Sequence, residues 1–242
     1  MKAALRLGAM TAGAALVLGS AGAAYASSAS STSTSTPSNS SGSGRLDIVK
    51  ATAHARIAGR LATLHALALD VSDSKYLTSD EKSALDTQID SDLSALTALS
   101  SKMAAETTAA AVRADEVAMV DDYRVYLLMA PQTRLTEALA AESDAAATLQ
   151  KAYTALSDLA AKQSGGATAT QKAELANLQA EVAAAQSAFA NQVSTELAVQ
   201  PGPDEAAIHA SLEPVKDAVK TARQELVKAR SDAKQLRASL KA

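Results

Sequence analysis

The chain has 242 residues, a formal net charge of −3, no cysteine and no tryptophan. Without cysteine there can be no disulfide bond, no thiolate chemistry and no cysteine-ligated zinc or iron–sulfur centre. Aromatic residues make up only 2% of the chain. A core must therefore be built from alanine, leucine, valine and isoleucine, which favours closely spaced helices.

The first 26 residues have the pattern of a secretory signal peptide. Lys2 and Arg6 form a short basic start, residues 7–19 are apolar and small, and residues 24–26 match an A-x-A cleavage site. An uncleaved anchor helix is the alternative, but the apolar run is shorter than the roughly 20 residues that span a bilayer. We predict cleavage before Ser27, a secreted protein that is extracellular or associated with the cell surface, and no transmembrane span in the mature chain.

Residues 27–44 form a low-complexity segment with ten serines, three threonines and no large apolar side chain. Nothing in this segment offsets the entropy lost on ordering, so we expect a disordered linker that spans about 24 Å as a flexible coil. Its hydroxyl groups could carry sugars. The sequence leaves open whether the linker is glycosylated or is a plain solvated spacer.

Residues 45–242 are expected to form one all-α domain. Glycine and proline are rare in this range, and the larger apolar side chains recur at steps of three and four residues. Two capping boxes, Thr78 with Glu81 and Thr168 with Gln171, support two of the helix starts. The predicted helices lie near 46–72, 79–105, 109–130, 132–163, 169–198 and 211–240, with an extra turn at 204–210.

Short connections between long helices favour antiparallel neighbours. The last predicted helix has the clearest heptad pattern, with apolar residues at steps of 3-4-3-4 from Leu212 to Leu240. We therefore predict an elongated up-and-down antiparallel helical bundle with coiled-coil-like packing. The apolar seam of the last helix could be covered within the chain or by a second copy, so the oligomeric state stays open.

The segment 120–135, VDDYRVYLLMAPQTRL, holds two of the six aromatic residues of the chain. We favour a core anchor at a helix corner, with Arg124 paired to Asp121 or Asp122 and with the helix broken or kinked at Pro131. The alternative is a contact site for a partner or ligand. Its residues would be Tyr123, Arg124, Tyr126, Met129 and Arg134.

Three stretches together resemble a family of uncharacterised exported helical proteins of actinobacteria. They are LTSDEKSALDTQIDSDLSALTALSSKMAAET (77–107), DYRVYLLMAPQTRL (122–135) and the basic end formed by VKTARQELVKARSDAKQLRA (219–238) and LKA (240–242). The resemblance covers residues 45–242. It implies export and a helical fold, and the family carries no assigned activity, ligand or catalytic residue.

Patterns typical of enzymes and metal sites are missing from the sequence. On one helix His54 and His65 would lie about 16 Å apart, too far to share a metal ion. The adjacent carboxylates of Asp121 and Asp122 point about 100° apart on a helix and do not converge. No H-E-x-x-H motif, glycine-rich phosphate loop or G-x-S-x-G motif occurs. We expect no enzymatic activity and no cofactor.

Charge is unevenly distributed along the chain. Residues 215–242 hold eight lysines or arginines against three acidic residues, whereas residues 27–214 carry a surplus of about ten negative charges. The last helix could dock on acidic helices of its own bundle, which we favour. It could instead present a cationic strip to a cell-envelope protein, an anionic wall polymer, lipid headgroups or nucleic acid, without reading a nucleic acid sequence.

These features predict a secreted, non-catalytic helical bundle that acts as a structural or interaction module at the cell surface. A carrier that binds an apolar or amphipathic ligand between helices is the alternative hypothesis. The residues expected to line its ligand site are Tyr123, Tyr126, Met129 and Phe189.

Overall fold

The computed structural model of the protein describes residues 41–241, and these residues are almost entirely helical. The predicted signal peptide, residues 1–26, and residues 27–40 of the predicted linker lie outside the described range. The last four residues of that linker, 41–44, already belong to the first helix. No strand occurs in the described part of the chain, so the predicted all-α fold is confirmed.

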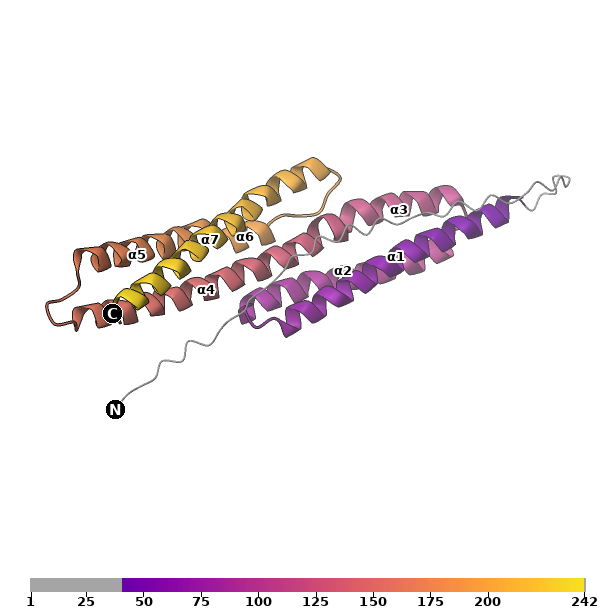
Figure 1. The fold of residues 1–242 in the computed structure, drawn as a ribbon. Helices are drawn as coiled ribbons and strands as arrows, with labels where there is room; N and C mark the ends of the chain where they lie inside the picture. Colours follow the sequence, from indigo (N-terminus) through magenta and orange to yellow (C-terminus); the bar gives the residue numbers. More distant parts are fainter. Residues whose placement is uncertain (1–40, 242) are drawn as a thin grey trace, which may run out of the picture. The chain divides into compact units, whose positions relative to one another are not determined.

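Seven α-helices and one π-helical turn follow one another in the described residues (Figure 1). They are α1 (Ser41–Asp73), α2 (Ser79–Ala105), α3 (Ala109–Tyr123), η1 (Val125–Met129), α4 (Ala130–Ala161), α5 (Ala169–Phe189), α6 (Gln192–Leu197) and α7 (Glu205–Ser239). Both predicted capping boxes are present, at the starts of α2 and α5. None of the described helices is long and apolar enough to cross a membrane.

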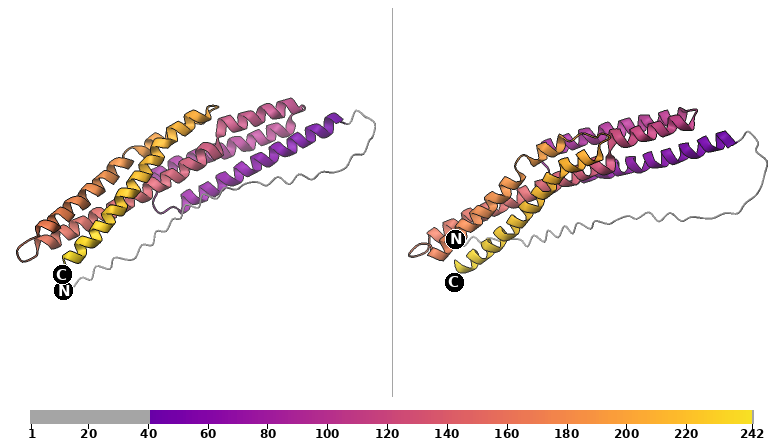
Figure 2. Two further views of the ribbon diagram at one scale, coloured as in Figure 1. Left: turned by 45° about the horizontal axis from the view of Figure 1, so that its top comes forward. Right: turned by 90° about the horizontal axis from the view of Figure 1, so that it is seen from above.

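Helices α1, α2 and α3 form what we call the first bundle (Figure 1 and Figure 2). The ammonium group of Lys50 in α1 donates a hydrogen bond to the carbonyl oxygen of Ala104 at the end of α2 (2.7 Å), as antiparallel packing requires. Arg56 of α1 pairs with Glu116 of α3 at 2.7 Å, and α3 runs parallel to α1. The fully buried core side chains include Ile57, Leu64, Leu85, Ile89, Leu96, Met103, Val112 and Met119.

Helices α4, α5 and α7 form the second bundle. The side-chain amide of Gln171, at the start of α5, donates to the carbonyl oxygen of Ser239 at the end of α7 (3.4 Å), so these two helices are antiparallel. Arg223 of α7 pairs with Glu142 of α4 at 2.8 Å, and α4 runs parallel to α7. The core side chains are Ala146, Leu149, Leu156, Leu178, Val182, Ala185, Ala222, Leu226, Ala229 and Leu236.

The chain does not turn back between the predicted helices 109–130 and 132–163, because α3 and α4 run in the same direction and are joined by η1 (Figure 1). Arg124 adopts a left-handed backbone conformation (φ 41°, ψ 39°) and ends α3, and the wider π-helical turn η1 follows it. Pro131 lies in the first turn of α4, where its missing N–H is tolerated. Of the two outcomes expected at Pro131, a break or a kink, the break does not occur. The helix is interrupted at Arg124 instead. Helix α1 packs against α3, against η1 and against α4.

The predicted helix 169–198 is also interrupted. Ala190 leaves the helical conformation and Asn191 is left-handed (φ 60°), so α6 is a separate short helix. Asparagine tolerates this conformation better than most residues, because its short polar side chain can bond to the local backbone. The separate helix α6 then packs against both α4 and α7.

The last helix is longer than predicted, since α7 begins at Glu205 and includes the expected extra turn at 204–210. The carboxylate of Asp204 caps it by accepting a hydrogen bond from the N–H of Ala207 (2.9 Å). Pro214 lies inside the helix. The turns before this proline are held by Ile208 and Leu212, which are buried against Leu128, so the helix continues through it.

Candidate interaction surface

The structure does not bring the five predicted site residues together. Met129 is buried in the core of the first bundle and is only 4% exposed, whereas Tyr126 is 54% exposed. Tyr123 is half-buried and Arg134 is exposed. The two surface hollows described below are lined by other residues. Burial of Met129 speaks against the contact-site alternative, and the exposure of Tyr126 speaks against its place in the core.

Arg124 binds other parts of its own chain and is not available to a partner or ligand. Its guanidinium group donates to the carbonyl oxygens of Gly202 and Pro203, both at 2.8 Å, and pairs with Asp121 at 3.0 Å. The side chain is only 9% exposed. Arg124 therefore ties the turn before α7 to the corner between α3 and η1, and one of the two predicted acidic partners is confirmed.

Tyr126 lies against the outer side of α1. The guanidinium carbon of Arg60 stands 5.2 Å from the centre of the tyrosine ring, a cation–π distance. A Cβ atom added to Gly59 would lie 3.2 Å from the tyrosine hydroxyl oxygen. This tyrosine thus covers part of α1 on the surface of the first bundle.

A cluster of buried polar side chains holds α6 in place. Glu196 is fully buried, and its Oε2 atom accepts a hydrogen bond from the Thr136 hydroxyl (3.2 Å). The side-chain amide of Gln132 donates to the carbonyl oxygens of Glu196 (2.7 Å) and Val199 (3.2 Å). The Oε1 atom of Glu196 has no hydrogen-bond partner among the described residues. Burial penalises the charged form and raises the pKa of Glu196 to about 8, against the opposing hydrogen bond from Thr136.

This cluster was not predicted from the sequence, although two of its residues form a recognisable pattern. Gln132 and Thr136 occupy positions i and i+4 on the face of α4 that continues to the buried Leu139. Polar residues on a buried face require hydrogen-bond partners. The partner, Glu196, lies 60 residues further on, so the sequence indicates the need for a partner and not its identity. The cluster positions α6 and offers no second group for acid–base chemistry.

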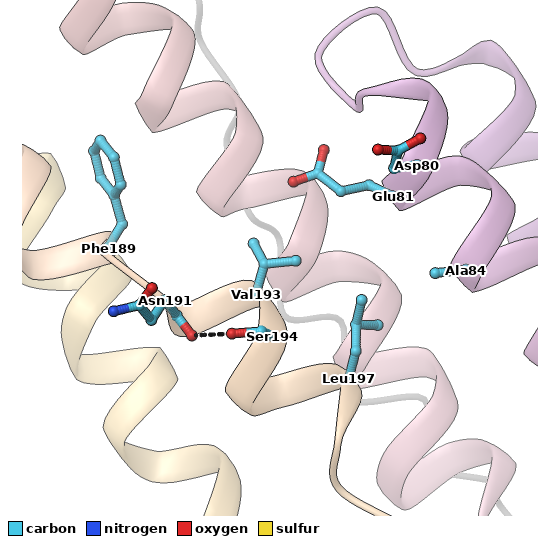
Figure 3. Close-up of a pocket in the computed structure, with 8 residues that line it drawn as sticks. All are labelled: Asp80, Glu81, Ala84, Phe189, Asn191, Val193, Ser194 and Leu197. Atoms are coloured by element: carbon cyan, nitrogen blue, oxygen red, sulfur yellow. Dashed lines mark hydrogen bonds between the residues drawn. The ribbon is translucent and has the colours of Figure 1, made fainter.

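One surface hollow of about 390 Å³ lies between the start of α2 and the α5–α6 corner (Figure 3). Its acidic members are Asp80 and Glu81, and Glu81 is already engaged in the capping box of α2. The Ser194 hydroxyl donates to the Asn191 carbonyl oxygen (2.9 Å). The other lining residues are Ala84, Phe189, Val193 and Leu197.

A second hollow, of about 660 Å³, is lined by the 198–204 turn and the first turns of α7. Its residues include Thr195, Val199, Ile208 and Ser211. Neither hollow joins a nucleophile to a base in the geometry that covalent catalysis needs. Phe189 and Met129 are also kept apart, since one lines the first hollow and the other belongs to the core of the first bundle. The carrier hypothesis gains no support from this arrangement.

No group of three or more metal-ligating side chains occurs within residues 41–241. His54 is engaged with the Ser100 hydroxyl at 3.0 Å. His209 lies 3.7 Å from the carboxylate of Glu205 on the same helix. The three histidines are therefore explained by local contacts and by their exposed positions on the helices.

The most regular surface feature is a row of basic side chains on α7 and the turn that follows it, which we call the basic row. Its positions follow one another at steps of 4-3-4-3-4-3-4, and each lies one residue after a position of the apolar seam. At 1.5 Å per residue the row is about 37 Å long. Its residues are Lys216, Lys220, Arg223, Arg230, Lys234, Arg237 and Lys241, with the exposed Val227 between Arg223 and Arg230.

Few charges of the basic row are paired. Lys216 pairs with Glu213 one turn earlier on α7, and Arg223 pairs with Glu142 of α4. The other five side chains have no ion-pair partner among the described residues. The expectation that the basic helix is neutralised by acidic helices of its own bundle is therefore met by Arg223 and wrong for most of the row.

Two acidic residues of α7, Glu225 and Asp232, lie on the flank opposite the basic row, whereas Glu213 lies on the flank of the row itself. Glu225 and Asp232 each precede a seam position and stand close enough to Glu181 of α5 for their charges to raise the pKa of that carboxyl, in addition to the larger effect of burial. Lys228 pairs with Glu225 on the same side at 2.8 Å. The α5-facing flank of α7 thus holds Glu225 and Asp232, and the α4-facing flank holds the basic row.

The fold and this surface define an all-α protein of two three-helix bundles with a one-sided cationic helix. No family model, no curated protein and no solved structure matches the chain. The resemblance to exported actinobacterial proteins stays a prediction, and function has to be inferred from the geometry.

Proposed function

We propose that the protein is a secreted, non-catalytic helical bundle that acts as a structural or interaction module at the cell surface. The basic row carries this proposal, because five of its seven cations are left without an ion-pair partner in the described residues. Like charges in a row repel one another, and a partner of opposite charge relieves that repulsion. The row is therefore a surface suited to binding an anionic partner.

The use of the bulky side chains supports the same proposal. Leucine, isoleucine and methionine fill most of the first core, and leucine, valine and alanine fill the second. The large apolar side chains that remain exposed are scattered over different helices: Ile48, Leu69, Val117, Tyr126, Leu159 and Val227. Single exposed apolar residues are normal for a protein surface. Contact is therefore expected to depend on charge, and the secretory pattern of the first 26 residues would bring that charge to the envelope.

Cell fractionation tests the proposal. The full chain is produced with a C-terminal tag in bacteria that secrete proteins across one membrane, and the fraction bound to washed cells is compared with the fraction in the medium. We expect a form that begins at Ser27, is held on the cells at low salt and is released by 0.5 M salt, where the Debye length is about 4 Å. A protein that remains inside the cells with residues 1–26 attached would contradict the proposal.

A matched pair of variants identifies the surface. Lys220→Gln, Arg230→Gln, Lys234→Gln and Lys241→Gln together remove four unpaired charges of the basic row and should move the protein from the cells to the medium. The control removes four basic charges elsewhere, through Arg45→Gln, Lys75→Gln, Arg113→Gln and Lys151→Gln, and should stay on the cells. Equal retention of both variants would refute a role for the row.

A further inference from the structure

From the shape and chemistry of the basic row we propose that its partner is a flexible linear polymer of polyol phosphate, bound lengthwise along α7. This inference rests on the proposed function and specifies the partner. The row is one side chain wide and about 37 Å long, and its seven charges follow one another at an average rise of about 6 Å, with one gap of about 10 Å at Val227. An extended phosphodiester chain carries charge with a similar linear density, so successive phosphates can meet successive cations.

The types of side chain in the row favour phosphate as the anionic group. Arg223, Arg230 and Arg237 are one heptad apart, and the planar guanidinium group binds phosphate oxygens in pairs. Lysines occupy the other positions and act as flexible point charges. Arg230 and Arg237 have no ion-pair partner in the described chain, whereas Arg223 shares its charge with Glu142. The stronger contacts are therefore expected in the C-terminal half of the row.

The lack of large apolar side chains argues against a folded protein as the partner. Interfaces between proteins depend on buried aromatic and aliphatic anchors. Within the row, Val227 is the single apolar position, and it is 61% exposed. A membrane surface is disfavoured for the same reason, because interfacial helices need bulky apolar residues beside their basic face. The apolar seam of α7 is used inside the second bundle.

The lack of aromatic residues also argues against nucleic acid. Proteins that bind single strands stack the bases on aromatic rings, and each stacked base contributes substantially to affinity. None of the six aromatic residues of the chain falls within residues 205–241. A polymer whose phosphates are joined by small polyols needs only contacts to its phosphates, and the basic row can provide these. A nucleic acid bound there would leave its bases without stacking partners.

Binding of the purified full chain to a fluorescent poly(glycerol phosphate) of about ten units, followed by anisotropy, tests the inference. Five neutralised phosphates predict a slope of about −3.5 for log K against log salt, hence roughly 100-fold weaker binding at 200 mM than at 50 mM salt. The Lys220, Arg230, Lys234 and Lys241 variant should bind at least 100-fold more weakly at 50 mM salt. The control variant at Arg45, Lys75, Arg113 and Lys151 should keep the affinity and the slope.

Two competing probes decide between sources of phosphate. A ten-nucleotide oligothymidylate carries the same charge and adds bases, and vesicles with 30% phosphatidylglycerol present phosphodiesters on a membrane. We expect both to bind no more tightly than poly(glycerol phosphate) at equal phosphate concentration. Tighter binding of either probe, by tenfold or more, would overturn the choice of polymer. Circular dichroism of each variant confirms that the helices are retained.

This experiment separates failure of the inference from failure of the proposed function. If poly(glycerol phosphate) does not bind, yet the row variant is still lost from cells, then the partner class is wrong and the interaction module stands. If the row variant remains on the cells, then the proposed function fails, whatever the polymer does.

Discussion

The cores of the first and second bundles are filled by side chains of different size. In the first bundle, leucine, isoleucine and methionine occupy most of the fully buried positions, among them Ile89, Leu96 and Met103. In the second bundle alanine takes a large share. Ala185, Ala222 and Ala229 are completely buried there. Helices that meet through alanine can approach closely, whereas leucine and methionine bury more apolar surface per residue.

This difference indicates that the two bundles are stabilised in different ways. Each buried CH₂ group contributes roughly 0.8 kcal/mol, so the first bundle depends mainly on the bulk of its core. The second bundle depends more on the close fit of its backbones. The first should therefore be sensitive to truncation of a core side chain, and the second to enlargement. The basic row belongs to the second bundle, whose narrow apolar seam leaves the flanks of α7 for charged residues.

Truncation in the first bundle has the largest expected effect. Leu96 is fully buried, and Leu96→Ala should lower the free energy of unfolding by about 2–5 kcal/mol, through lost burial and the cavity left behind. Urea unfolding followed by circular dichroism measures this change. Leu69→Ala, at a position that is 66% exposed on α1, is the control and should change stability by less than about 0.5 kcal/mol. Similar values for the two variants would refute the assignment of Leu96 to the core.

The second prediction concerns α6, where the two bundles meet. Leu197 packs against the core of the first bundle, while Gln132 of α4 holds the neighbouring backbone. Burial raises the pKa of Glu196 to about 8 from its ordinary 4.5, against an opposing hydrogen bond from Thr136. Between these two pH values the native state keeps a proton that the unfolded chain releases. Stability should therefore fall as the pH rises from about 4.5 to about 8, by roughly 1.4 kcal/mol per pH unit.

Glu196→Gln tests this pH dependence, because the amide stays neutral throughout. Urea unfolding of both proteins from pH 5 to pH 8 should give similar stabilities at pH 5 and a variant more stable by about 3 kcal/mol at pH 7. Burial also raises the pKa of Asp92, to about 6, but this carboxyl is present in both proteins and cancels in the difference. Parallel stability curves for the two proteins would show that Glu196 does not keep its proton in the folded state.

Enlargement in the second bundle has the next largest effect. Ala222 is fully buried in the seam of α7, and Ala222→Leu adds three carbon atoms where the helices meet closely. Overpacking of this kind costs typically 1–3 kcal/mol. Thermal unfolding should show a lower midpoint. Exposed Ala238 is the control on the same helix, and Ala238→Leu should leave the midpoint almost unchanged. A stabilising Ala222→Leu would mean that the second core is loosely packed, contrary to the comparison.

The sequence predicted the parts of the fold that local physics determines. The capping pairs at Thr78 and Thr168 mark the starts of α2 and α5, because a hydroxyl and a side chain three residues later satisfy the free N–H groups of a first turn. The seam from Leu212 to Leu240 gives the buried face of α7, apart from Ala233 and Leu240, which are half-buried.

The missed features depend on partners far away in the chain. The left-handed conformation of Arg124 is unfavourable for a residue with a Cβ atom, and its compensation comes from the carbonyl groups of Gly202 and Pro203, almost 80 residues later. The basic row differs from these features, because the local sequence alone determines its alignment. That alignment follows from the seam itself, because each row position comes one residue after a seam position.

The smallest expected effect concerns the outer side of the first bundle, where Tyr126 covers α1. Alanine is favoured over glycine in a helix interior by about 1 kcal/mol, so helix propensity alone would make Gly59→Ala stabilising. The new Cβ atom, however, would lie 3.2 Å from the Tyr126 hydroxyl oxygen, and the ring would have to move from its place beside Arg60. The two effects should nearly cancel in the wild-type background.

In a Tyr126→Phe background the hydroxyl is gone, so Gly59→Ala should then stabilise by about 1 kcal/mol. A double-mutant cycle by urea unfolding measures the difference. If Gly59→Ala raises the free energy of unfolding by about 1 kcal/mol in both backgrounds, then the Tyr126 side chain moves aside freely and does not support the first bundle.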